Sequence, residues 1–253
     1  MELHFEASGD GEPLIVLHGL FGSLDNWRSI SARLSAHFTV FALDHRNHGG
    51  SAHAAEMDYL LMAQDVVEFL DKRGISHSHV LGHSMGGKTA MQLALSYPNR
   101  VNKLIVADIA PRTYPPWHEK MIAGMLDLDL ARFDSRAQME AALAPAVPDL
   151  PTRRFLLKNV VRKAGNGFAW RMGLEQIKVN YSRLTQAVLA GEPFEKPVLF
   201  VRGANSEYIL ETDFSEIRRL FPRAEIKTLR DADHLLHIQS PQEFVHLVTS
   251  FLS

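Results

Sequence analysis

The sequence predicts an α/β fold in which a mostly parallel sheet is covered by helices. Short apolar runs of strand length alternate with longer segments whose apolar residues lie three and four positions apart. The chain has 253 residues, of which 46% are hydrophobic and 22% are charged. This composition and this length are typical of a globular protein with a well-buried core.

Seven segments are predicted to be strands, because each is a short apolar run of strand length. In chain order they cover residues 3–7, 14–17, 38–43, 79–81, 103–107, 198–201 and 225–229. Five segments between them have the apolar spacing of amphipathic helices, at 25–36, 60–73, 87–97, 212–221 and 241–252. Helix ends are marked by proline, at Pro98, Pro222 and Pro241.

The alternation stops between residues 111 and 195, where the sequence reads as helices without a convincing strand. This segment begins with PRTYPPW and ends with GEPFEKP, two proline-rich stretches that suit hinges. We therefore predict a core made of residues 1–110 and 196–253, and a helical cap made of residues 111–195 that covers the sheet.

Charge and cysteine content exclude several classes of protein. With 27 Lys and Arg against 29 Asp and Glu, the net charge of −2 gives no strong field for nucleic acid or an anionic membrane. The absence of cysteine excludes disulfides, thiolate nucleophiles and thiolate-bound metals. The first residues do not resemble a signal peptide, and no apolar run approaches the ~18 residues of a membrane span. We expect a cytoplasmic protein that does not bind nucleic acid or span a membrane.

The sharpest local motif is GHSMGG (82–87), which lies between a predicted strand and a predicted helix. A serine in such a tight turn takes a strained backbone conformation, so the residues two before and two after it must be small. Gly82 and Gly86 meet this requirement around Ser84. The start of the following helix also favours negative charge beside the serine. The motif therefore predicts a nucleophile elbow.

A competing interpretation is a phosphate-binding loop, because GHSMGGKT (82–89) also fits the pattern G-x-x-x-x-G-K-[ST]. Asp108, at the end of the apolar run LIVAD, resembles the aspartate that binds Mg²⁺ in P-loop NTPases. Two other segments decide against this alternative. HGLFG (18–22) follows a strand where hydrolases place an oxyanion-binding backbone N–H, and His234 follows the strand 225–229 at the edge that carries Ser84. A P-loop protein would leave both segments unexplained.

With these residues the chain resembles the α/β-hydrolase-fold serine hydrolases, and more closely the small YbfF-type bacterial esterases. The resemblance covers nearly the whole chain. The matching stretches are HGLFGSLDNW (18–27), DHRNHGGS (44–51), GHSMGGK (82–88), VADIAP (106–111), RGANSEY (202–208) and DADH (231–234). The resemblance implies hydrolysis of carboxylic esters or thioesters of small to medium acyl groups through an acyl-enzyme. It also implies a small-molecule substrate, no cofactor, and a helical cap over the pocket. Asn47 and His48 depart from the commoner D-x-R-G-x-G-x-S pattern.

Carried over to this sequence, the resemblance makes Ser84 the nucleophile and His234 its general base. The backbone N–H groups of Leu20 and Met85 are expected to stabilise the oxyanion, with Phe21 as the alternative to Leu20.

A catalytic triad also needs an acid that orients the histidine, and here the sequence departs from the commonest arrangement. Hydrolases of this fold most often place an aspartate at the position that Ser206 occupies here. A variant arrangement places the acid one strand earlier, where Asp108 keeps the order Ser, acid, His. We therefore predict Asp108 as the acid, with Glu207 and Asp213 as the alternatives on the later strand.

Other candidate residues have simpler explanations. His45 with His48, and His234 with His237, have spacings that a metal site could use, but no third ligand is apparent and we expect no metal. Lys88 reads as a residue of the first turn of a helix. The aromatic residues of the predicted cap are expected to be mostly core residues, while some of them form an apolar pocket wall together with Phe21.

A non-hydrolytic member of the same fold is the remaining alternative function, because a fold does not fix a function.

Overall fold

The computed structural model describes residues 1–163, 167–189 and 191–253. Its centre is a seven-stranded sheet in the order β1-β3-β2-β4-β5-β8-β9. The antiparallel pair β1–β3 lies at one edge, and every other neighbouring pair is parallel. The strands are β1 (Phe5–Ser8), β2 (Glu12–Leu17), β3 (Phe38–Leu43), β4 (Ser78–His83), β5 (Val101–Ala107), β8 (Val198–Gly203) and β9 (Ala224–Leu229). The predicted α/β class and its mostly parallel sheet are confirmed.

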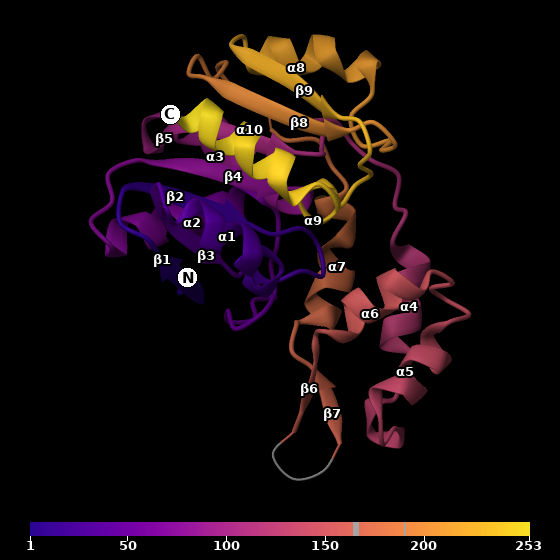
Figure 1. Ribbon diagram of the computed structural model, residues 1–253. Helices are drawn as coiled ribbons and strands as arrows, with labels where there is room; N and C mark the ends of the chain where they lie inside the picture. Colours follow the sequence, from indigo (N-terminus) through magenta and orange to yellow (C-terminus); the bar gives the residue numbers. More distant parts are fainter. Residues whose placement is uncertain (164–166, 190) are drawn as a thin grey trace.

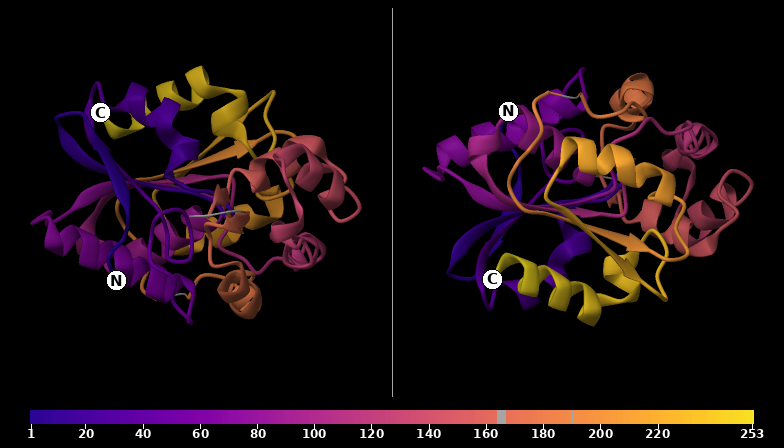
Figure 2. Two further views of the ribbon diagram at one scale, coloured as in Figure 1. Left: turned by 90° about the horizontal axis from the view of Figure 1, so that it is seen from below. Right: turned by 90° about the horizontal axis from the view of Figure 1, so that it is seen from above.

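Helices cover both faces of this sheet, as the two views in Figure 2 show. One face is packed by α1 (Arg28–Leu34) and α10 (Pro241–Leu252), and the other by α2 (Tyr59–Lys72), α3 (Met85–Ser96) and α8 (Phe214–Leu220). Burial follows the helical period: α10 buries Phe244, Val248 and Leu252, which lie four residues apart along one side of the helix. The two apolar layers fix the positions of the strand ends.

The segment between β5 and β8 forms a separate group of elements, seen to one side of the sheet in Figure 1. It contains α4 (Glu119–Leu126), α5 (Arg136–Leu143), α6 (Leu150–Leu157), β6 (Val160–Arg162), β7 (Phe168–Trp170) and α7 (Leu174–Leu184). The antiparallel pair β6–β7 corrects the expectation of helices without a strand from 111 to 195. A strand of three residues is too short to show an alternating pattern, so periodicity could not reveal it.

The remaining helical elements of the described residues are five single-turn helices. They are η1 (Leu24–Trp27), η2 (Pro98–Arg100), η3 (Leu130–Arg132), η4 (Glu211–Asp213) and α9 (Leu236–Gln239). The predicted helices at 25–36 and 212–221 each correspond to such a turn followed by a short α-helix.

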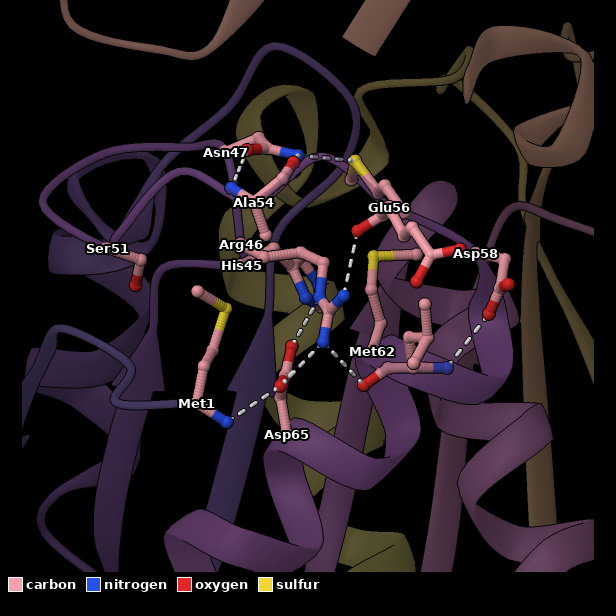
Figure 3. A network of polar contacts seen from close by, with 12 residues as sticks. Met1, His45, Arg46, Asn47, Ser51, Ala54, Glu56, Asp58, Met62 and Asp65 are labelled. Carbon is pink, nitrogen blue, oxygen red and sulfur yellow. Dashed lines mark hydrogen bonds and ion pairs between the residues drawn. The ribbon is translucent and has the colours of Figure 1, made fainter. Parts of the chain in front are cut away.

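The loop between β3 and α2 ties the sheet to this inserted segment. Its Arg46 makes a two-pronged ion pair with Asp65 of α2, with N–O distances of 2.7 and 2.8 Å, and donates to the carbonyl oxygen of Glu56 (Figure 3). Further along, the carbonyl oxygen of Asn47 accepts the N–H of Gly173 at 2.9 Å. The charged pair is almost fully buried. The loop is thus bonded to the core through Asp65 and to the inserted segment through Gly173.

Candidate active site

Four strand ends bring the predicted site residues together at the carboxyl edge of the sheet. Ser84 follows β4 and Asp108 follows β5, while the HGLFG segment follows β2 and His234 lies in the loop after β9. These are neighbouring strands in the sheet, apart from β8 between β5 and β9. The carboxyl edge of an open parallel sheet is where ligands bind in this architecture.

Ser84 occupies the strained turn that the motif predicted. Its φ of 53° and ψ of −120° lie in a region that residues other than glycine rarely adopt. A Cβ at position 82 would lie 2.1 Å from the carbonyl oxygen of Gly86, and a Cβ at position 86 would lie 2.4 Å from that of Leu17. Glycine is therefore required on both sides of Ser84, as the sequence analysis argued.

His234 lies between Ser84 and Asp108. Its Nε2 is 3.0 Å from Ser84 Oγ, and its Nδ1 is 2.9 Å from Asp108 Oδ2. The ring of Tyr208 stacks on the imidazole with centroids 3.7 Å apart, and His83 Nε2 donates to the carbonyl oxygen of His234 at 2.7 Å. These contacts fix both the plane of the ring and the loop that carries it.

Asp108 is completely buried and serves as an acceptor for three donors. Its Oδ1 accepts the N–H of Gly203 at 3.0 Å, while Oδ2 accepts the Ser206 hydroxyl in addition to His234 Nδ1. The residue has a φ of 50°, a left-handed conformation that turns the chain sharply at the end of β5. The serine that replaces the more usual carboxylate is thus bonded directly to Asp108.

The two alternative acids are engaged elsewhere or exposed. Asp213 pairs with Arg112 at 2.9 Å and accepts the N–H of Leu210 at 2.8 Å. Glu207 is exposed. Within the described part of the chain, Asp108 is the carboxylate that the structure brings to His234.

The HGLFG segment forms a tight turn beside Ser84. The N–H of Gly22 donates to the carbonyl oxygen of Gly19 at 3.0 Å, and Phe21 has a φ of 60°. The N–H of Phe21 donates to His48 Nε2 at 3.3 Å. Among the described residues, the N–H groups of Leu20 and Met85 make no hydrogen bond. These two groups are free to bind a ligand.

A cavity of about 720 Å³ opens beside Ser84 and His234, and its walls include the side chains of Phe21, Trp117 and Phe155. A smaller cavity of about 50 Å³ is lined by Ser84 together with Tyr181. Three further aromatic residues of the inserted segment, Phe133, Phe168 and Trp170, line neither cavity and pack in a separate apolar cluster. Aromatic residues of the inserted segment thus divide between pocket and core, as expected.

Lys88 is buried, with 1% of its surface exposed, and its ammonium group does not face Ser84 as a free cation. Nζ donates to the carbonyl oxygens of Arg112, at 2.7 Å, and Gln186. These oxygens belong to the two ends of the inserted segment, and burial lowers the pKa of Lys88 to about 7. A P-loop lysine reaches out to bound phosphates, so this geometry gives the phosphate-loop interpretation no support.

The remaining histidines near the site hold loops together. His18 Nδ1 donates to the carbonyl oxygen of Gly19 at 2.8 Å, and burial lowers the pKa of His237 to about 3. His237 stacks on Trp27 with ring centroids 4.4 Å apart. In residues 1–163, 167–189 and 191–253, no group of three or more His, Asp or Glu side chains could hold a metal ion.

Several residues around the site escaped the sequence analysis. Tyr208 ends the matching stretch RGANSEY, but its stacking on His234 was not predicted. Asn159, which donates to the carbonyl oxygen of Phe21 at 2.7 Å, lies in no motif. His48 was noticed as a departure from a pattern, and that departure was the available signal of its contact with Phe21. The burial of Lys88 was also missed.

Comparison with known proteins places the chain in a family. Residues 12–241 match the family model described as alpha/beta hydrolase fold. The chain is 38% identical to a mouse (Mus musculus) protein described as sn-1-specific diacylglycerol lipase ABHD11, over 95% of this chain and 80% of that protein. It is 30% identical to esterase YbfF of Escherichia coli, over 96% of this chain and 94% of that protein. The solved structure of a marine microorganism esterase superposes with a TM-score of 0.96 at 39% identity, covering 99% of both chains.

Fold, strand-end residues and cavity together define an enzyme of the ester-hydrolysing class. The chain belongs to the α/β-hydrolase fold family, among its esterases and lipases, and the predicted resemblance to the YbfF-type esterases is confirmed. No helix in the described ranges is long and apolar enough to cross a membrane.

Proposed function

We propose that this protein is a serine hydrolase that cleaves carboxylic esters or thioesters of small to medium acyl groups through an acyl-enzyme. The observation that carries the proposal is the continuous chain of hydrogen bonds from Asp108 through His234 to Ser84, with distances of 2.9 and 3.0 Å. A hydroxyl becomes an effective nucleophile when a positioned imidazole accepts its proton, and a buried carboxylate holds that imidazole in the required tautomer.

In the proposed mechanism, Ser84 Oγ attacks the ester carbonyl carbon while His234 Nε2 takes the hydroxyl proton. Asp108 accepts from Nδ1 and stabilises the imidazolium that forms. The tetrahedral oxyanion collapses, the protonated His234 gives its proton to the departing alcohol or thiol, and the acyl group remains on Ser84. A water molecule, activated by the same imidazole, then releases the acid and restores the serine.

The N–H groups of Leu20 and Met85 are the proposed oxyanion donors. Both lie beside Ser84 and neither makes a hydrogen bond to a described residue, whereas the N–H of Phe21 is already bonded to His48. This supports Leu20 over Phe21. The N-terminal end of α3, which begins at Met85, adds a favourable dipole for the negative charge.

We propose residues 111–195 as a cap over the substrate pocket. Trp117 and Phe155 from this segment wall the larger cavity, facing Phe21 from the core. A volume of about 720 Å³ lies in the range that small-molecule sites occupy, so the pocket has room for a medium acyl chain or a bulky leaving group. The diacylglycerol lipase and esterase descriptions of the relatives agree with an ester substrate that is largely apolar.

The proposal is tested with a panel of p-nitrophenyl and coenzyme A esters of increasing acyl length, assayed on wild-type protein and on Ser84→Ala. We expect turnover of short and medium esters by the wild type, and loss of nearly all of it in the variant. Ester turnover that survives Ser84→Ala, or turnover of none of the panel, would refute the proposal.

A further inference from the structure

The turn that carries Leu20 is strained, and this requires an explanation. Residues 19–22 close a four-residue turn through the Gly22 N–H to Gly19 carbonyl bond, with Phe21 at its third position. A φ of 60° there gives the type II arrangement, which ordinarily needs glycine or asparagine at that position. Relief of this strain would rotate one of the two peptides beside Phe21. A flip of the Leu20–Phe21 peptide gives the type I arrangement and turns the Leu20 carbonyl and the Phe21 N–H, whereas a rotation of the Phe21–Gly22 peptide moves the Phe21 carbonyl.

From the core, His48 holds the turn in its strained form. The carbonyl oxygen of Arg46 accepts from His48 Nδ1 at 3.0 Å, so the ring proton is on Nδ1 and Nε2 is an acceptor. That Nε2 accepts the N–H of Phe21 at 3.3 Å. His48 is fully buried and its pKa is lowered to about 3 by that burial, so it remains an acceptor throughout the neutral range.

From the inserted segment, Asn159 holds the same residue through its carbonyl group. Asn159 Nδ2 donates to the carbonyl oxygen of Phe21 at 2.7 Å and to that of Leu156 at 3.2 Å. Asn159 is 3% exposed and directly precedes β6. Both polar groups of the strained residue are therefore bonded, one by the core and one by the segment proposed as the cap.

We propose that Asn159 is a positioning residue for the oxyanion hole, acting through Phe21 to keep the Leu20 N–H aimed at the developing negative charge. This inference rests on the proposed function and adds a link from the cap to the chemistry. Oxyanion donors act within a narrow range of distances, about 2.7–3.1 Å, so a shift of the turn too small to alter substrate binding by much would still take the Leu20 N–H out of range.

The structure supplies a matched control in Asn180. This residue is also 3% exposed and also belongs to the inserted segment. Its Nδ2 donates to a core carbonyl oxygen, that of Ala55 at 2.7 Å, and to that of Gln176 in its own helix at 2.8 Å. It thus repeats the bonding of Asn159, but its core partner is Ala55, in the loop between β3 and α2, and not a residue of the oxyanion turn.

The experiment compares Asn159→Leu with Asn180→Leu, using kcat and KM for p-nitrophenyl butyrate, the inhibition constant of an alkyl trifluoromethyl ketone, and the thermal midpoint. The ketone forms a tetrahedral adduct with an oxyanion, so its affinity reports on the hole. We expect Asn159→Leu to lower kcat about 10- to 100-fold, less than the ~10²–10³ lost when a donor is removed outright. The inhibition constant should rise by a similar factor while KM stays within about 3-fold of wild type. Asn180→Leu should lower the midpoint comparably and leave kcat and inhibition near wild type.

A rescue separates positioning from simple destabilisation. Glycine adopts a positive φ without strain, so Phe21→Gly added to Asn159→Leu should recover part of the lost kcat. If Asn159→Leu does not fold, Asn159→Ser replaces it, since the shorter side chain keeps a polar group but does not reach Phe21.

Three outcomes would overturn the inference: equal kcat in the two leucine variants, inhibition that does not follow kcat, or no recovery with Phe21→Gly. A wild-type protein without Ser84-dependent turnover would instead overturn the proposed function on which the inference rests.

Discussion

The Asp108→Asn variant tests the assignment of Asp108 as the triad acid, which departs from the commonest arrangement in this fold. The substitution keeps the shape of the side chain but turns one of its two acceptor oxygens into a donor NH₂ group. The carboxylate now accepts on both sides, from Gly203 N–H at Oδ1 and from His234 Nδ1 at Oδ2. An amide can satisfy only one side. Because the backbone N–H of Gly203 cannot change its role, the amide oxygen is expected to face Gly203 and the NH₂ group to face His234.

The consequence is the wrong tautomer of the imidazole. Facing an NH₂ group, Nδ1 must become the acceptor, so the proton moves to Nε2 and that atom can no longer take the proton from Ser84. Loss of tautomer and charge partner together is expected to lower kcat by about 10³–10⁴, or ~4–5.5 kcal/mol of transition-state stabilisation.

The assay is kcat for p-nitrophenyl butyrate, with circular dichroism to show that the variant is folded. Ser206→Ala is the matched control, because it removes a neutral donor to the same oxygen and should cost far less. Activity of Asp108→Asn within a few-fold of wild type, with loss of activity in Glu207 or Asp213 variants, would refute the assignment.

Three further predictions concern stability. Asp65→Asn leaves the buried Arg46 without its charge partner and should lower the free energy of unfolding by about 3–5 kcal/mol, measured by urea titration. Lys88→Met leaves two buried carbonyl oxygens without a donor and should lower the free energy of unfolding by about 1–3 kcal/mol in the same titration. Because Lys88 is not expected to bind phosphate, the substitution should not change Mg²⁺-dependent ATP hydrolysis. His237 has its folded pKa lowered to about 3, against ~6.5 unfolded, so between these values the unfolded chain binds the extra proton and stability falls as pH falls. His237→Phe should therefore reduce that loss by about 1.4 kcal/mol per pH unit between pH 6 and 4.

Each of these has a result that contradicts it. An Asp65→Asn protein as stable as wild type would show that the ion pair contributes nothing net, and ATP hydrolysis that disappears in Lys88→Met would restore the phosphate-loop interpretation. An unchanged pH slope in His237→Phe would mean that His237 is accessible to protons in the folded state.

The fold was largely predictable because its signals are local. The periodicity of apolar residues predicts strands and helices, and the edge of the sheet that carries the site follows from where parallel strands end. Ser84, Asp108 and His234 could be proposed because each closely follows a predicted strand, and because the resemblance to the α/β-hydrolase family assigns catalytic roles to those positions. Their mutual distances are geometry that the structure supplies.

The features that escaped prediction are long-range or very short. Asn159 and Phe21 are 138 positions apart, and no spacing rule connects them. Lys88 looked like an ordinary helix residue because its partners, the carbonyl oxygens of Arg112 and Gln186, are backbone groups that no side-chain pattern reveals. The β6–β7 hairpin was missed because three residues per strand are too few to alternate visibly.

The most direct test of the central claim is covalent labelling with a fluorophosphonate, followed by peptide mass spectrometry and an esterase assay. The proposed mechanism predicts one adduct, on the peptide that contains Ser84, with loss of turnover in proportion to labelling. It also predicts that His234→Ala, which removes the base 3.0 Å from Ser84 Oγ, abolishes the labelling. Stoichiometric labelling at another residue, or full esterase activity in protein that is completely labelled at Ser84, would contradict the account.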